Sequence, residues 1–253
     1  MYINVRKRLG LSALMATLFV LGGCAATQTA IGKKDLVVQT KTSMSVFVDP
    51  VSKSKRTIYM DIKSGVMEFD RREFKKFVKE QFAANDSGYT LVDDPERAQF
   101  QMVAYVLNLE IASLTAAEAA LNQGYLGGAV AGGAAVGALA NSSNRWAGAA
   151  AGGLLGGAFE VIGSALVKDV TYMLVCDVQI REKAAKGVFV RKDTAVTAKI
   201  SDSGTSKQSV SEVGKYKEYR TRIVTTANKA NLKLPEAQPL MFAKTAYAMS
   251  GFF

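Results

Sequence analysis

The chain has 253 residues, 49% of them hydrophobic, and a formal net charge of +10 at pH 7. It can bury one sizeable core or at most two small ones, and we expect a single domain. Histidine is absent, which removes the commonest general base and the commonest metal ligand. The basic residues are scattered through segments of mixed charge, so we interpret them as solvated surface and predict no nucleic-acid partner.

The first 23 residues have the pattern of a secretory signal peptide. Three cationic residues at 6–8 precede an apolar run from Leu9 to Leu21, which is followed by two glycines and Cys24. The run has roughly half the length of a membrane-spanning helix. The segment also resembles the lipobox of bacterial lipoproteins, which implies cleavage before Cys24 and an N-acyl diacylglyceryl lipid on this residue. We predict no other cofactor.

Several consequences follow from a lipid on Cys24. Multiple acyl chains hold a protein firmly on a membrane, whereas one chain anchors it only marginally. Residue 25 is alanine and not the aspartate that resembles an inner-membrane retention signal, which favours the outer membrane. The signal holds three cations and no acid, so its loss lowers the net charge from +10 to +7. Cys176 is left without a disulfide partner, and its alternating apolar strand predicts a small buried side chain.

The first part of the mature chain predicts strands followed by a helix. Residues 25–34 are a polar tether, and β-branched and aromatic residues predict strands at 36–40, 46–48 and 57–62. Apolar residues then recur at helical spacing, which predicts an amphipathic helix over about residues 66–84. Its core-facing stripe consists of Met67, Phe74, Phe77, Val78 and Phe82.

Two further strands are predicted at 89–92 and 100–111, separated by a turn at 93–95. Asp93 and Asp94 in this turn could be interpreted as an acid–base pair or as metal ligands. Carboxylates before a proline more often cap the turn, and no third ligand is evident. We therefore predict no catalytic residue, no metal site and no enzymatic activity.

Residues 124–167 differ sharply in composition from the rest of the chain. Two apolar arms, 124–140 and 146–167, flank the polar tip 141–145, which predicts a helical hairpin. The arms have no polar face, so lipid or a tight bundle must surround them. Small residues four apart let helices approach closely in membranes. The predicted packing residues are Gly124, Gly128, Gly132, Gly133, Gly137, Gly148, Gly152, Gly153, Gly156 and Gly157.

The lengths of the arms fit a membrane hairpin. About 17 and 22 residues span roughly 25 and 33 Å, against a hydrocarbon core of about 30 Å. Tyr125 and Trp146 stand where interfacial anchors are expected, and Glu160 is expected to face the interior of the bundle. A glycine-rich surface loop is the alternative interpretation. A phosphate-binding loop is dropped because no Lys-Ser or Lys-Thr follows the glycines.

The remaining residues predict a second group of strands and a terminal helix. Strands at about 169–181 and 187–200 suggest a β-hairpin, and the polar residues 201–214 suggest a mobile loop. A strand is expected at 216–225, and a helix at 235–250 with proline at its start. The predicted fold class is an α/β (α+β) lipoprotein domain, residues 24–253, with a small mixed sheet and an inserted Gly/Ala-rich membrane helical hairpin.

Four blocks of the mature chain resemble the TraT family of outer-membrane lipoproteins. These are AIGKKDLVVQTKTSMSVFVDP at 30–50, LNQGYLGGAVAGGAAVGA at 121–138, KDVTYMLVCDVQIRE at 168–182 and YRTRIVTTANKANLKL at 219–234. Several separate blocks in the right order are specific, whereas the glycine-alanine region alone would be weak. The residues around 141–145 and the tail after Pro239 depart most from the family pattern.

The resemblance implies a surface-exposed, ring-like homo-oligomer in the outer membrane. It implies surface exclusion in conjugation, with the donor cell's mating surface or pilus components as partners, and protection against complement. Neither role involves catalysis. Two other functions remain open from the residues alone: an oligomeric outer-membrane export channel and a structural envelope lipoprotein.

Overall fold

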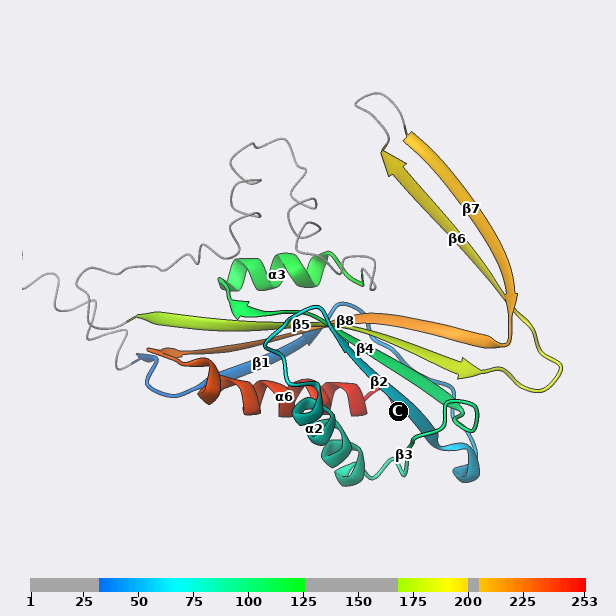
Figure 1. Cartoon of the computed structure of the whole chain (residues 1–253), viewed down its shortest axis with the longest axis horizontal. Helices are drawn as coiled ribbons and strands as arrows, with labels where there is room; N and C mark the ends of the chain where they lie inside the picture. Colours follow the sequence, from blue (N-terminus) through cyan, green and yellow to red (C-terminus); the bar gives the residue numbers. More distant parts are fainter. Residues whose placement is uncertain (1–31, 126–167, 200–204) are drawn as a thin grey trace, which may run out of the picture.

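The computed structural model describes residues 32–125, 168–199 and 205–253. Six strands form a mixed sheet in the order β1-β8-β5-β4-β2-β3 (Figure 1). β1, β8, β5 and β4 pair antiparallel, whereas β2 runs parallel to both β4 and β3. The strands are β1 Val37–Thr42, β2 Thr57–Ser64, β3 Thr90–Val92, β4 Phe100–Ile111, β5 Asp169–Lys183 and β8 Tyr216–Ala230. The predicted mixed sheet is confirmed.

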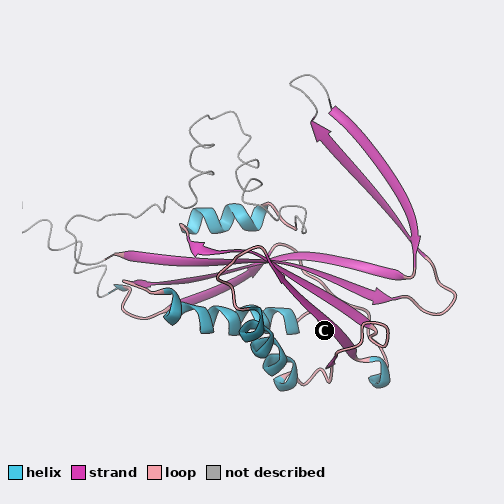
Figure 2. Ribbon diagram, in the orientation of Figure 1, coloured by secondary structure: helices cyan, strands magenta, loops and turns pink. Residues whose placement is uncertain are grey.

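Helices lie on both faces of this sheet. α2 (Arg71–Ala84) and α6 (Leu234–Ser250) cover one face, and α3 (Leu114–Asn122) lies on the other (Figures 1 and 2). A single 3-10 turn, η1 (Lys53–Lys55), precedes β2. The mixed α/β class predicted for the body is therefore confirmed.

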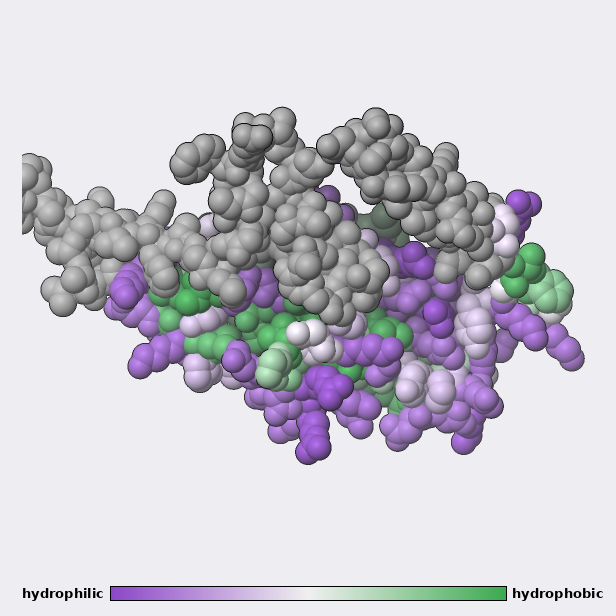
Figure 3. All heavy atoms as spheres, turned by 45° about the horizontal axis from the view of Figure 1, so that its top comes forward, coloured by the Kyte–Doolittle hydropathy of each residue, from purple (hydrophilic) through white to green (hydrophobic). Residues whose placement is uncertain are grey.

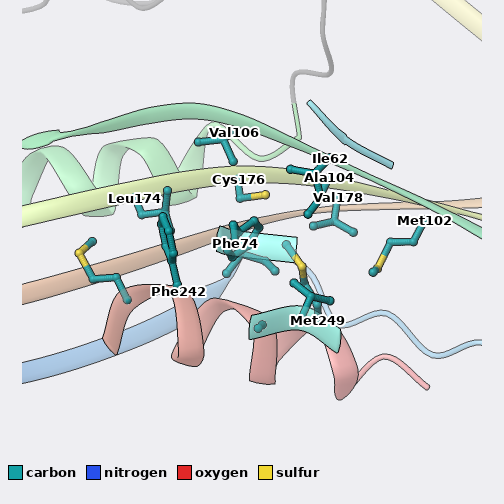
Figure 4. Packing of buried hydrophobic residues seen from close by; sticks show 14 of the residues in the cluster. Ile62, Phe74, Met102, Ala104, Val106, Leu174, Cys176, Val178, Phe242 and Met249 are labelled. Atoms are coloured by element: carbon teal, nitrogen blue, oxygen red, sulfur yellow. The ribbon is translucent and has the colours of Figure 1, made fainter. Parts of the chain in front are cut away.

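The main core lies between the sheet and the α2 and α6 helices. β5 contributes Leu174, Cys176 and Val178 to this side, where they face Phe74 and Phe242 (Figure 4). On the opposite face, Met173 and Val175 of the same strand pack under α3. β5 is buried on both faces because helices cover both sides of the middle of the sheet. Cys176 is fully buried, as predicted.

The start of α2 differs from the prediction. The helix begins at Arg71, because the Asp70 side chain accepts hydrogen bonds from the backbone N–H groups of residues 72 and 73, at 2.8 and 3.0 Å. Phe69 packs edge-on against Phe74, with 5.4 Å between ring centroids, and so fixes the direction in which the chain enters the helix. Met67 lies before the helix and is fully exposed, so its predicted place in the core is wrong.

Two further differences from the predicted elements lie in the first half of the chain. Residues 46–48 form no strand, although Val46 is buried and Val48 packs against the core. The pairing of β1 with β8 ends at Thr42, and the chain then leaves the edge of the sheet. The last contact with β8 here is the hydrogen bond that the Thr221 hydroxyl donates to the Met44 carbonyl. The second difference is α3, which was not predicted. Ser113 begins this helix by accepting a hydrogen bond from the N–H of residue 116.

A third difference concerns residues 187–214. β6 (Val190–Lys199) does not pair with β5, and the predicted mobile loop contains strand β7 (Thr205–Gly214). β6 and β7 form their own two-stranded ribbon, which projects from the end of the main sheet (Figure 1). β5 instead pairs with β8 along its whole length, from Asp169 opposite Ala230 to Lys183 opposite Tyr216. The ribbon is thus an insertion within a β5–β8 hairpin.

The carboxyl-terminal elements agree closely with the sequence. β8 extends five residues beyond the predicted end at Thr225. α6 starts with proline in its first turn, as predicted. No helix within the described ranges is long and apolar enough to cross a bilayer. The predicted membrane hairpin lies almost wholly in residues 126–167, outside the described residues, and stays a prediction.

Candidate functional site

Most of the predicted site residues lie outside the described part of the chain. These are Cys24, Glu160 and all the packing glycines except Gly124. Gly124 has φ +66°, in the left-handed region that favours glycine, and its N–H donates to the Leu121 carbonyl. It therefore ends α3 and is not part of a helical arm, so any first arm begins after it. The structure does define the two points where the 126–167 insertion joins the body.

The first junction rests on a buried ion pair beneath α3. Arg222 of β8 donates to both carboxylate oxygens of Asp177 on β5, from Nε at 2.7 Å and from Nη2 at 3.1 Å. The two side chains are 2% and 0% exposed. They are direct cross-strand neighbours, so the sheet itself fixes their geometry. A bidentate pair of this kind is strongly directional.

Arg222 also holds the carboxyl-terminal end of α3. Its Nη1 donates to the Ala120 carbonyl at 3.1 Å and lies 3.5 Å from Oε1 of Gln123. The Ala120 carbonyl is one of the last four in the helix, which lack a partner inside it. A cation at this end also interacts favourably with the helix dipole. The guanidinium thereby ties the helix that precedes the insertion to the middle of the sheet.

A second arginine of β8 holds the residue at the edge of the insertion. The Arg220 guanidinium lies over the Tyr125 ring, 5.4 Å from its centroid, and also bonds Glu218 at 2.9 Å. Burial raises the pKa of the Tyr125 phenol, so this group stays neutral. Tyr125 was predicted to be a membrane-interface anchor. In the structure it is a protein contact that fixes the first junction.

The second junction lies at the far end of β8. The Lys168 N–H donates to Oδ1 of Asn231 at 2.9 Å, and the Asn231 N–H donates back to the Lys168 carbonyl at 2.7 Å. Asn231 has φ 55°, a conformation that asparagine tolerates better than most residues. Asn228 fixes the next residue, Asp169, through a 2.7 Å hydrogen bond. Both ends of the insertion are thus bound to β8.

Sequence reasoning missed this arrangement. The available signal was one charged residue in each of two short, mostly apolar stretches, Asp177 in VCDVQI and Arg222 in TRIV. Charges of opposite sign in neighbouring buried strands are expected to pair. The sequence did not show that β5 and β8 are neighbours, because 26 of the residues between them belong to the ribbon region 189–214.

The described residues show little that could perform covalent chemistry. Asp94 accepts a hydrogen bond from the Glu96 N–H at 2.8 Å, so it caps its turn as predicted. Burial raises the pKa of the Cys176 thiol well above its usual range, which keeps it protonated. Among the described ranges, no three acidic or cysteine side chains gather in a way that could hold a metal ion. The contacts at both junctions hold the base of the insertion against the sheet.

The fold and its site define a class of protein: a mixed α/β domain that carries a long glycine-rich insertion on a fixed base. The chain belongs to the TraT family, because residues 35–253 match the family model "Enterobacterial TraT complement resistance protein". It is 35% identical over 241 residues to a TraT complement resistance protein of Escherichia coli, covering 93% of each chain. A TraT complement resistance protein of Escherichia coli strain K12 is 34% identical over 235 residues, again covering 93% of each.

One solved structure also resembles the chain, at a much greater distance. The PelC dodecamer from Paraburkholderia phytofirmans matches 85% of this chain and 98% of its own, with a TM-score of 0.31 and 6% identity. A likeness this low has no bearing on assembly or function.

Proposed function

We propose that the protein is an outer-membrane lipoprotein that mediates surface exclusion in bacterial conjugation. In a recipient cell it hinders stable mating contact with a redundant donor. The observation that carries the proposal is the TraT family match over residues 35–253, in a chain whose Cys24 follows a lipobox-like segment. The relatives' shared description as complement resistance proteins supports a second role, protection against complement.

The mechanism is occlusion by a multivalent assembly. The 126–167 region supplies membrane-embedded helices whose small residues pack against neighbouring copies, with Glu160 inside the bundle. Arg222 and Asn231 support this view, because they hold the two junctions of the insertion against the body. A ring of identical bodies then presents many weak contacts together, which raises the overall avidity for a mating surface.

The test is the conjugation frequency into recipients that express the protein, with a related conjugative plasmid in the donor. Recipients that express Cys24→Ala serve as the matched control. A marked fall in frequency with the intact protein, relieved by the substitution, supports exclusion that depends on the lipid. Mass spectrometry of the amino-terminal peptide tests the lipid directly.

The opposite outcome is equally informative. An unchanged frequency across several donor plasmids, with protease accessibility showing the protein at the cell surface, would contradict surface exclusion. Survival in serum, measured with the same strains, tests the complement role separately. A protein that fails both assays would point to the export or structural envelope functions.

A further inference from the structure

The segment that leads to Cys24 and the second junction of the insertion leave the body at one corner. The Ala230 N–H donates to the Lys33 carbonyl at 2.9 Å, next to the bond between Asn231 and Lys168. The Lys33 ammonium also pairs with Asp169. Figure 1 shows β1 and β5 beginning, and β8 ending, at this same end of the sheet. We call residues 33–35, 168–169, 229 and 233–236 the exit corner.

The exit corner is rich in lysine. It contains five lysines and three acidic residues, so its formal net charge is +2. The lysines are Lys33, Lys34, Lys168, Lys229 and Lys233, and the acids are Asp35, Asp169 and Glu236. Lys33 pairs with Asp169 and Lys229 pairs with Glu236. The other three lysines are exposed. Figure 3 shows hydrophilic and hydrophobic residues side by side at this end of the described body.

The corner lies close to the proposed lipid. Eight residues lead from Cys24 to Gly32, which at full extension span at most about 29 Å. Residues 25–32 carry no charged side chain, so the exit corner holds the first charges that follow the anchor. An acyl anchor and a basic cluster are the two signals that together give stable binding to an anionic membrane.

We propose that the exit corner binds the phosphate groups of anionic lipid headgroups in the membrane that holds the anchor. This inference rests on the lipid anchor of the proposed function. Lys34, Lys168 and Lys233 approach the headgroups, and each contributes about fivefold to membrane partitioning. The corner thereby turns the ends of β1, β5 and β8 toward the bilayer and directs the β6–β7 ribbon away from it.

The experiment measures vesicle co-sedimentation of the full chain as Cys24→Ser, so that no lipid masks the effect of charge. Vesicles of phosphatidylcholine alone are compared with vesicles containing about 30% phosphatidylglycerol. The preference is the ratio of the partition coefficients for the anionic and the neutral vesicles. We expect this ratio to fall at least about tenfold in the triple variant Lys34→Gln, Lys168→Gln, Lys233→Gln. The matched control removes three exposed lysines from η1 and α2, as Lys53→Gln, Lys55→Gln, Lys79→Gln, and should lose less than about threefold.

Two results would overturn the proposal. One is an anionic preference that is the same in the triple variant as in the unsubstituted Cys24→Ser chain. The other is a loss of anionic preference in the η1 and α2 control that equals the loss in the triple variant, which would assign the effect to net charge and not to the exit corner. Because this chain carries no lipid, a failed anchor or failed exclusion would appear in the mating assay and not in the sedimentation. Equal urea midpoints for the two triple variants confirm that both are folded.

Discussion

Arg222 and Asp177 are charged side chains buried in the middle of the sheet, beneath α3. Removing a charge from water is unfavourable, and this pair is tolerated because the guanidinium donates to both carboxylate oxygens and also to the Ala120 carbonyl. A hydrophobic pair could fill the same space, but it could not hold the Ala120 carbonyl. The ion pair is therefore best explained by positioning of the helix end.

Arg222→Met should lower the free energy of unfolding by about 3–5 kcal/mol, because it leaves the Asp177 carboxylate buried and unpaired. Urea-induced unfolding followed by circular dichroism measures this loss. The double variant Arg222→Met, Asp177→Leu should regain most of it. Hydrogen exchange in residues 114–125 should nevertheless stay faster than in the native chain. Arg220→Met is the control, since its side chain is 41% exposed and should change stability by less than about 1 kcal/mol.

Cys176 should resist thiol reagents while the protein is folded. Burial raises the pKa of this thiol, so the thiolate that reacts is scarce even at pH 9, and no path leads reagent to the sulfur. Maleimide labelling of the lipidated protein should therefore be negligible in buffer and complete in concentrated urea. Rapid labelling in buffer would contradict the packing of β5 between the two helical layers.

Among the helices and strands, the predicted bounds agree best where burial against the core imposes a regular spacing of apolar residues. β4 agrees with its predicted bounds, and α6 and β5 differ from theirs by two residues or fewer. The predictions failed for elements whose sequences have no such apolar spacing, namely β7 and α3. β7 has the polar sequence TSKQSVSEVG and pairs only with β6 among the described strands, and a polar stretch without alternation looks like a loop. α3 was missed for a similar reason, since LTAAEAALN buries chiefly Ala117.

The candidate site was predictable only in outline. Composition marked the insertion, but its junctions depend on contacts between residues far apart in sequence, such as Arg222 with Ala120 and Asn231 with Lys168. A single sequence contains no direct record of such contacts. Strand pairing decides which charged residues meet, and the order of β5, β8 and the ribbon could not be derived from periodicity.

The β6–β7 ribbon should be dispensable for folding. Lys183 and Tyr216 are cross-strand neighbours, and the Ala184 N–H already donates to the Lys215 carbonyl. Replacing residues 185–214 with Asn-Gly should therefore close a direct β5–β8 hairpin. We expect the thermal midpoint of the variant to stay within about 4 °C of the native value. A larger fall, with loss of native circular dichroism, would show that the ribbon stabilises the body.

On the scale of the whole molecule, the body and the insertion have separate roles. Residues of the sheet, α2 and α6 pack together in the main core, and α3 covers a smaller cluster on the other face. We expect substitutions in the insertion to affect the assembly of copies and to leave the free energy of unfolding of the body unchanged.

Gly132→Leu and Gly152→Leu test this separation. A leucine in a small-residue ridge keeps helices apart, so each variant should lose the native oligomer on a blue native gel. Its urea midpoint should match that of the unsubstituted protein. A variant that still forms the oligomer would contradict the packing of glycine ridges between copies. Ala135→Leu, outside the glycine spacing, is the matched control.

The order of strands in the sheet has a consequence for biosynthesis. β1 is the first strand to be made, yet its neighbour β8 is the last, and β8 also separates β1 from β5. The sheet cannot close until residues 216–230 have left the ribosome, and α6, which covers one face, follows later still. Non-local pairing of this kind slows folding. A chain exported from its amino end can thus enter the translocation channel while it is still unfolded, without a folded body to obstruct its passage.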